Sequence, residues 1–178
     1  VNLAGLPPRP ASALQPGQSA LFDDLLRDAP GWDDVAWLQA NTRLPVILKG
    51  ILHPDDARQA ASLQAGGVIV SNHGGRTLDS APPTAEALPR IADALAGALP
   101  LLVDGGIRRG TDILKAMALG ANAVLVGKPY VFGLANAGAL GVAHVLRLLR
   151  DELEIAMALC GCATLDAIPA GLLGAGQP

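Results

Sequence analysis

Residues 68–79 read VIVSNHGGRTLD, an apolar run that passes directly into a polar, glycine-rich cluster. A short and continuously apolar run is typical of a strand covered on both faces, as in a parallel sheet. The polar cluster would then leave the carboxyl end of that strand, which is where α/β proteins place their ligands. The stretch therefore predicts an α/β fold with its functional residues at the ends of parallel strands.

The sequence on both sides repeats this transition. From residue 33 onward, short apolar runs alternate with helical patterns, and strands are expected at 45–49, 68–71, 101–104 and 123–126. Helices are expected at 33–39, 54–63, 84–96, 111–119 and within 139–159. Such alternation indicates parallel βαβ units. Four strands leave two architectures open, a doubly wound sheet and half of an eight-stranded barrel.

The two ends of the chain differ from this central part. Residues 1–31 are rich in proline and predict a loop-rich segment with one helical turn at 21–27. The folded domain is expected at 32–173, followed by a tail at 174–178. Residues 129–146 carry no charge and are long enough to test as a membrane span. Asn136, His144 and several glycines favour a buried or amphipathic helix there instead.

The composition is that of a compact globular protein, with 51% hydrophobic residues among 178 and a formal net charge of -3. Without a block of Lys or Arg, neither nucleic acid nor an anionic membrane is an expected partner. The only cysteines, Cys160 and Cys162, predict reduced thiols and a cytoplasmic location. We expect no signal peptide and no metal site.

Two side chains of the 68–79 stretch suit proton and anion chemistry. His73 and Arg76 leave a predicted strand tip with two glycines between them, so both can face one cavity. Imidazole is suited to proton removal near neutral pH, and guanidinium grips a carboxylate through paired N–H groups. The pair predicts a substrate with a proton to lose and a carboxylate. The alternative is a loop histidine beside a surface arginine.

A second cluster, DGGIRRGTD at 104–112, predicts an anion site. Its glycines let backbone N–H groups approach a phosphate, and the following helix dipole favours an anion. Gly127 and Lys128 end the next strand and would form a second wall. Lys49 ends the first strand and should face the same cavity, where it could stabilise negative charge. Solvated arginines in an ordinary turn, and a surface lysine, are the alternatives.

Three stretches, LPVILKGI (44–51), SNHGGRTLD (71–79) and DGGIRRGTD (104–112), resemble signatures of the FMN-dependent α-hydroxy-acid oxidases and dehydrogenases. That family includes glycolate oxidase, lactate oxidase and mandelate dehydrogenase, and the resemblance extends from about Asn2 to Leu173. It implies a (β/α)8 TIM barrel, of which this chain supplies strands five to eight as the C-terminal half. It also implies FMN as the cofactor and oxidation of a small 2-hydroxy acid to a 2-oxo acid.

The resemblance also implies roles for individual residues. His73 would be the catalytic base, Arg76 would join it in binding the substrate, and Lys49 would stabilise the reduced flavin. The other implied FMN contacts are Ser71, Asp104, Gly105, Gly106, Ile107, Arg108, Gly127 and Lys128. Lys128 stands where the family usually has arginine, which keeps the charge but loses the planar fork.

Strands one to four of such a barrel are absent from this sequence. Half a barrel leaves sheet edges and apolar helix faces uncovered, which favours association with copies of the chain or with the missing N-terminal half. The opening Val1, in place of a methionine, favours a fragment of a longer protein. Two other functions stay open, a non-catalytic half-barrel that binds FMN or phosphate and another FMN-dependent barrel enzyme.

Overall fold

The computed structural model describes residues 14–26 and 29–174. Contacts divide the chain into two compact units, Val1–Thr42 and Arg43–Pro178. The first unit holds a short π-helix, η1 (Ala20–Leu25), which overlaps the expected turn, and α1 (Trp32–Asn41). Residues 1–13 of the expected loop and 175–178 of the expected tail lie outside the described residues, and the domain boundary expected at residue 31 stays a prediction.

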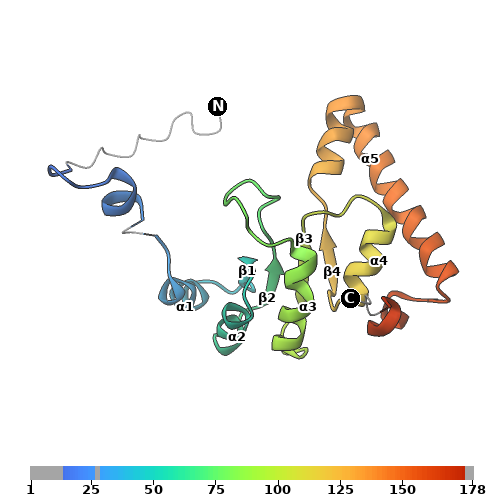
Figure 1. Cartoon of the computed structure of the whole chain (residues 1–178), viewed down its shortest axis with the longest axis horizontal. Helices are drawn as coiled ribbons and strands as arrows, with labels where there is room; N and C mark the ends of the chain where they lie inside the picture. Colours follow the sequence, from blue (N-terminus) through green and yellow to red (C-terminus); the bar gives the residue numbers. More distant parts are fainter. Residues whose placement is uncertain (1–13, 27–28, 175–178) are drawn as a thin grey trace. The chain divides into compact units, whose positions relative to one another are not determined.

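The second unit is built on a four-stranded parallel sheet (Figure 1). Its strands lie side by side in chain order: β1 (Ile47–Ile51), β2 (Gly67–Val70), β3 (Leu101–Asp104) and β4 (Ala123–Leu125). The connections run through α2 (Pro54–Ser62), α3 (Thr84–Leu95) and α4 (Gly110–Ala118). This confirms the predicted α/β fold, and the ends of these elements lie within two residues of the predicted ones.

The three connecting helices form one layer. Parallel crossovers are right-handed in almost all proteins, so a sheet that grows in one direction carries its helices on one face. Accordingly α2 packs against α3, and Gly120, just after α4, lies against Ala92 of α3. The order of the described strands never reverses, whereas a doubly wound sheet has such a reversal. The carboxyl ends of all four strands therefore lie at the same edge of the sheet, and the helix layer covers only one of its two faces.

The core lies between β2, β3 and the helix layer. All four residues of β2 are buried, because this strand has a neighbour on each side and helices against one face. The largest fully buried side chains are Val68, Val70, Ser71, Leu88 and Ile91. The edge strands are less covered, and Ile47 in β1 is 45% exposed. β1 and β4 thus end the sheet with unpaired backbone groups at both sides.

The last long helix, α5 (Lys128–Leu159), is a folded-back pair of arms (Figure 1). The helix interrupts at Ala137 (φ −146°) and Gly138 (φ +56°). Gly133 and Gly141 then let the arms touch, since a Cβ on Gly141 would lie 1.9 Å from the Gly133 carbonyl oxygen. The expected helix within 139–159 therefore forms only the second arm, and the chain becomes helical eleven residues earlier than predicted.

By length and composition, α5 is the one helix among the described residues that qualifies as a possible membrane span. Its most apolar window has a mean hydropathy of 1.4 and is 11% buried. The uncharged stretch 129–146 straddles the break at Ala137 and Gly138, so no straight helix contains it. The second arm continues into the exposed ion pairs Arg147–Asp151 and Arg150–Glu154, and the hydrogen bond to Glu154 raises the pKa of Arg150.

Candidate active site

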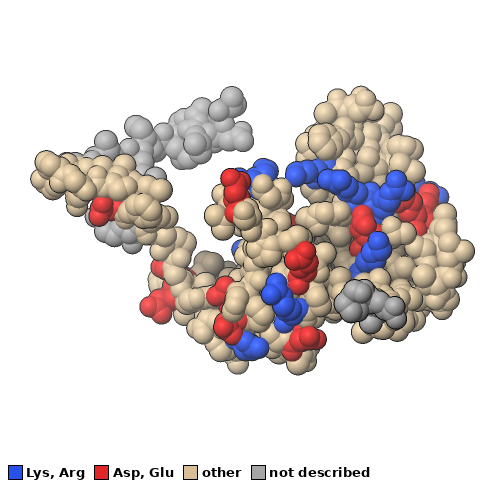
Figure 2. Space-filling view, in the orientation of Figure 1, with Lys and Arg blue, Asp and Glu red and all other residues tan. Residues whose placement is uncertain are grey.

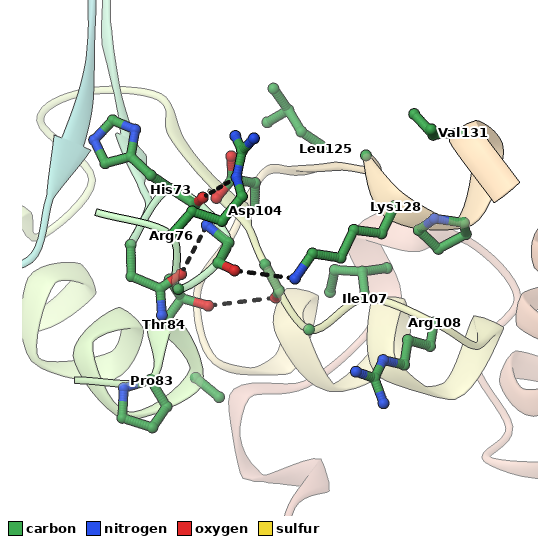
Figure 3. A pocket seen from close by; sticks show the side chains of 18 of the residues that line it. His73, Arg76, Pro83, Thr84, Asp104, Ile107, Arg108, Leu125, Lys128 and Val131 are labelled. Atoms are coloured by element: carbon green, nitrogen blue, oxygen red, sulfur yellow. Dashed lines mark hydrogen bonds between the residues drawn. The ribbon is translucent and has the colours of Figure 1, made fainter. Parts of the chain in front are cut away.

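A cavity of about 660 Å³ opens at the carboxyl ends of the strands (Figure 3). Its size falls within the usual range for small-molecule sites. Three loops, which follow β2, β3 and β4, form most of its wall, and β1 adds the side chain of Lys49. The residues predicted from the sequence that line it are Lys49, His73, Arg76, Asp104, Gly105, Gly106, Ile107, Arg108, Gly127 and Lys128.

Ser71 is the predicted site residue that does not line the cavity. It is fully buried directly after β2, and its hydroxyl accepts hydrogen bonds from Lys49 Nζ at 2.7 Å and from the His73 amide at 3.1 Å. The Lys49 ammonium also lies 2.8 Å from Asp104 Oδ2. Parallel pairing of β1, β2 and β3 brings these three residues together. Ser71 therefore lies behind the cavity wall and holds Lys49 and the His73 backbone in place.

The carboxylate of Asp104 has an unequal environment. Oδ2 pairs with Lys49, whereas Oδ1 is buried and has no hydrogen-bond partner among the described residues. A buried carboxylate oxygen without a hydrogen-bond partner costs free energy, so a bound group that donates a hydrogen bond to it would stabilise the site. Asp104 lines the cavity, so a ligand with a hydroxyl group could provide that donor.

The loop after β2 is shaped by a hydrogen bond that spans its histidine. Asn72 Oδ1 accepts a hydrogen bond from the Gly74 amide at 3.2 Å, and His73 adopts a left-handed conformation with φ +56°. The loop turns the imidazole over β1, where a Cβ on Gly50 would lie 3.0 Å from His73 Nε2. Asn72 was not among the predicted site residues, although its place between Ser71 and His73 was a signal.

Arg76 and Lys128 both hold the backbone of this loop (Figure 3). Arg76 Nε donates to the His73 carbonyl at 3.0 Å, and Lys128 Nζ donates to the Gly74 carbonyl at 3.0 Å. The terminal nitrogens of Arg76 have no partner among the described residues, so its fork stays available for an anion. Lys128 comes from the start of α5, and it links the β4 end of the cavity to the histidine loop.

The helix N-terminus expected to bind an anion is already occupied by carboxylates. Asp112 Oδ2 accepts from the Arg108 and Arg109 amides, each at 3.0 Å, and Glu152 Oε2 accepts from the Gly110 amide at 2.8 Å. The three N–H groups at the start of α4 and just before it therefore bind the protein's own side chains. Glu152 lies 42 residues away on α5, which is why this contact was missed.

The glycines after β3 and β4 and the N-terminus of α5 remain open to the cavity. Gly105 and Gly106 have φ values of +87° and +77°, which side chains rarely adopt, and a Cβ on Gly106 or Gly127 would meet nothing within 4 Å. α5 begins at Lys128 with Gly127 as its cap, and Pro129 and Tyr130 of its first turn also line the cavity. The N-terminus of α5 thus lies at the cavity, where its helix dipole favours an anion.

Positive charge dominates the cavity. Its described lining holds four cationic side chains, Lys49, Arg76, Arg108 and Lys128, against the single carboxylate of Asp104. Figure 2 shows Lys and Arg side chains gathered between the loop after β2 and α5. Figure 3 shows Lys128 directed toward the histidine loop and Arg108 on the far side of Ile107. Such a cavity favours a ligand with more than one anionic group.

Comparison with known proteins identifies a family and several relatives. Residues 3–175 match the family described as FMN-dependent dehydrogenase. The chain is 55% identical over 168 residues to an L-lactate oxidase of Alicycliphilus denitrificans, covering 94% of this chain and 46% of that protein. It is 56% identical over 137 residues to glycolate oxidase 1 of Zea mays, covering 77% of this chain and 37% of that protein.

Solved structures agree with these relatives. A mandelate oxidase variant with a monooxide FMN adduct matches with a TM-score of 0.77 and 52% identity, over 79% of this chain and 45% of that one. Mandelate oxidase with benzoyl-formic acid matches with the same TM-score and identity, over 79% of this chain and 42% of that one. The chain therefore spans about half the length of the relatives it matches.

Proposed function

The chain belongs to the FMN-dependent dehydrogenase family, and from this premise we propose that its cavity binds FMN and that the complete enzyme oxidises a small 2-hydroxy acid to a 2-oxo acid. The observation that carries the proposal is the convergence of His73, Arg76 and Lys49 on one cavity at the strand ends. A base, a carboxylate-binding fork and a cation for developing negative charge are the groups this oxidation requires.

The residues present fit FMN. The unpartnered Asp104 Oδ1 suits a hydroxyl of the ribityl chain, and the open glycines let backbone amides approach a phosphate. We assign the phosphate to Gly106, Ile107, Arg108, Gly127 and Lys128, together with the first turn of α5. This replaces the α4 dipole, on which the sequence-based expectation rested, because carboxylates already accept hydrogen bonds from the amides of Arg108, Arg109 and Gly110 at the start of α4.

His73 is the base in this proposal. Its amide is bonded to Ser71, and its ring lies beside Gly50, where an added Cβ would be 3.0 Å from Nε2. A neutral imidazole there takes the proton from the substrate as the hydroxyl-bearing carbon is oxidised. FMN, when bound, supplies the acceptor for the two electrons.

Arg76 binds the substrate carboxylate. Because Nε is used on the His73 carbonyl, the guanidinium is held with its two terminal nitrogens directed away from the loop backbone. Those nitrogens can form a pair of charge-assisted hydrogen bonds to a carboxylate. The bond to His73 also keeps the base and the anion-binding group of the loop at a constant separation, which orients the substrate.

We further propose that the chain forms strands five to eight of a (β/α)8 barrel, within residues 32–173. The sequential parallel sheet, the single helix layer and the exposed edge strands support this, as does the match to about half of each relative. Closure would require the complementary half or copies of this chain. The cytoplasmic location expected from Cys160 and Cys162 stays a prediction.

A spectrum of the complete enzyme, in which this chain is joined to strands one to four, tests the function. Binding of FMN and loss of its oxidised absorbance on addition of L-lactate, glycolate or mandelate would support the proposal. A protein that binds FMN and is not reduced by any 2-hydroxy acid would be another FMN-dependent barrel enzyme or a non-catalytic flavin-binding half-barrel. A complete enzyme without affinity for FMN would contradict the proposal.

A further inference from the structure

We propose that Asp104 is a positioning residue that, together with Ser71, holds the ammonium group of Lys49 in place and thereby sets how strongly Lys49 stabilises the reduced flavin. This inference rests on the proposed function, since it concerns the same cavity and FMN. It assigns Asp104 an action on Lys49 that is separate from any direct contact with the cofactor.

The geometry around Lys49 shows two anchors. Its Nζ lies 2.7 Å from Ser71 Oγ and 2.8 Å from Asp104 Oδ2, and these come from β1, the end of β2 and the end of β3. The lysine side chain is 39% exposed and has a flexible four-carbon stem. Without the anchors the ammonium would sample solvent, so the two oxygens select one position at the cavity wall.

The anchors are themselves rigid. Ser71 is fully buried and also accepts a hydrogen bond from the His73 amide, so it cannot follow a displaced lysine. The Asp104 side chain is 19% exposed and lies in the last residue of β3, paired in register with Leu125 of β4. One carboxylate oxygen serves Lys49, and the other remains buried without a described partner. A ligand hydroxyl on Oδ1 would therefore fix the same carboxylate that orients Lys49.

Two opposite effects of Asp104 can be separated by sign. As a bare negative charge, Asp104 would oppose a reduced, anionic flavin, and its removal would favour reduction. As an anchor, Asp104 keeps Lys49 near the flavin, and its removal would disfavour reduction. The second effect is the larger one, because a displaced ammonium in water loses most of its interaction with the flavin through solvent screening.

The experiment measures FMN affinity and the equilibrium between oxidised and reduced flavin in the complete enzyme. Asp104→Asn keeps the shape and an Oδ1 acceptor but removes the charge. We expect it to lower the ratio of reduced to oxidised flavin at a fixed potential by about tenfold, which is roughly 30 mV for a two-electron couple. Ser71→Ala, which keeps the charge and removes the other anchor, should change the ratio in the same direction.

A double-mutant cycle with Lys49→Met identifies the route of the effect. If Asp104 acts through Lys49, Asp104→Asn will not lower the ratio in the Lys49→Met protein. An equal loss in both backgrounds, or an unchanged or raised ratio in the single variant, would overturn the inference. If Asp104→Asn does not bind FMN, the Ser71→Ala variant alone is the test. An unchanged ratio of reduced to oxidised flavin in that variant would also overturn the inference.

Two controls complete the design. Glu86→Gln removes a carboxylate from the exposed first turn of α3, outside the cavity lining, and should leave the ratio unchanged. The parent protein is titrated with FMN first. If the parent does not bind FMN, the proposed function fails. If the parent binds FMN and the anchor variants leave its reduction unchanged, only the inference about Asp104 fails.

Discussion

The imidazole of His73 rests against Gly50, and a Cβ at position 50 would lie 3.0 Å from His73 Nε2. Gly50 has φ +104° and falls at the irregularity in the pairing of β1 with β2, between Lys49 and Ile51. The bulge lets the strand carry Lys49 into the cavity and still leave space for the ring. This part of β1 thus places the Lys49 cation and leaves space for the His73 ring.

Gly50→Ala should therefore impair catalysis as well as stability. The added methyl group would displace the His73 ring, and the left-handed backbone would cost about 1–2 kcal/mol. We expect flavin reduction to slow at least tenfold with little change in FMN affinity. Gly97→Ala is the matched control, because Gly97 has φ +81° and its Cβ would meet nothing within 4 Å. It should lose a similar amount of stability without slowing flavin reduction. Equal reduction rates for the two variants would show that Gly50 does not influence the His73 base.

Arg76→Lys should weaken 2-hydroxy acids far more than FMN. An ammonium cannot reproduce the paired contacts to a carboxylate, nor can it hold the His73 carbonyl at the same time. Loss of a charged hydrogen bond corresponds to about a ten- to hundredfold rise in the dissociation constant of the acid. The measurement is binding of a 2-hydroxy acid or of its 2-oxo product to the FMN-loaded enzyme. Equal losses for acid and FMN would place Arg76 in structural support only.

The two neighbouring arginines before α4 provide an internal comparison for the phosphate site. Arg108 lines the cavity and Arg109 does not, although both are exposed and both amides bond to Asp112. Arg108→Ala should weaken FMN by about tenfold or more through the lost charge-assisted contact. Riboflavin, which has no phosphate, should bind equally well to the parent and the variant, and Arg109→Ala should bind FMN as the parent does. A similar loss for riboflavin would contradict this assignment.

Much of the fold follows from local sequence. Apolar runs such as residues 68–70 and 101–103 are bounded by glycine or proline, so the strands and their connecting helices could be predicted to within two residues. The break in α5 was not predicted, because Gly133 and Gly141 have no local signal for the contact they make across the turn. Helix propensity alone predicts either one long unbroken helix here or a helix that begins after the break.

The cavity lining was also predictable, because every parallel strand ends in a polar or glycine-rich cluster and those ends must meet at one edge. The side-chain contacts within the site could not be predicted from the sequence. The pairing of Lys49 with Asp104 joins residues 55 positions apart in the sequence, and the contact of Glu152 with Gly110 depends on how α5 folds back on α4. Both arise from tertiary packing, which no spacing rule encodes.

The half-barrel assignment predicts that this chain alone is not a functional monomer. Its sheet ends in two edge strands, and α5 exposes large apolar side chains that a neighbouring chain or segment would cover. Co-expression with strands one to four of a relative should restore tight FMN binding and oxidation of a 2-hydroxy acid. The assay is flavin content and turnover of the purified chain, with and without that half. A monomer of 178 residues that oxidises a 2-hydroxy acid by itself would refute the assignment.

The most direct test of the central claim is single-turnover reduction of the bound flavin under anaerobic conditions, with parent and His73→Ala complete enzyme compared. His144→Ala, at an exposed position of α5 away from the cavity, serves as the control. We expect all three proteins to bind FMN and His73→Ala alone to reduce it about 10²–10⁴ times more slowly, because a positioned base is lost. Reduction of the His73→Ala flavin at the parental rate would contradict the claim that this chain supplies the base.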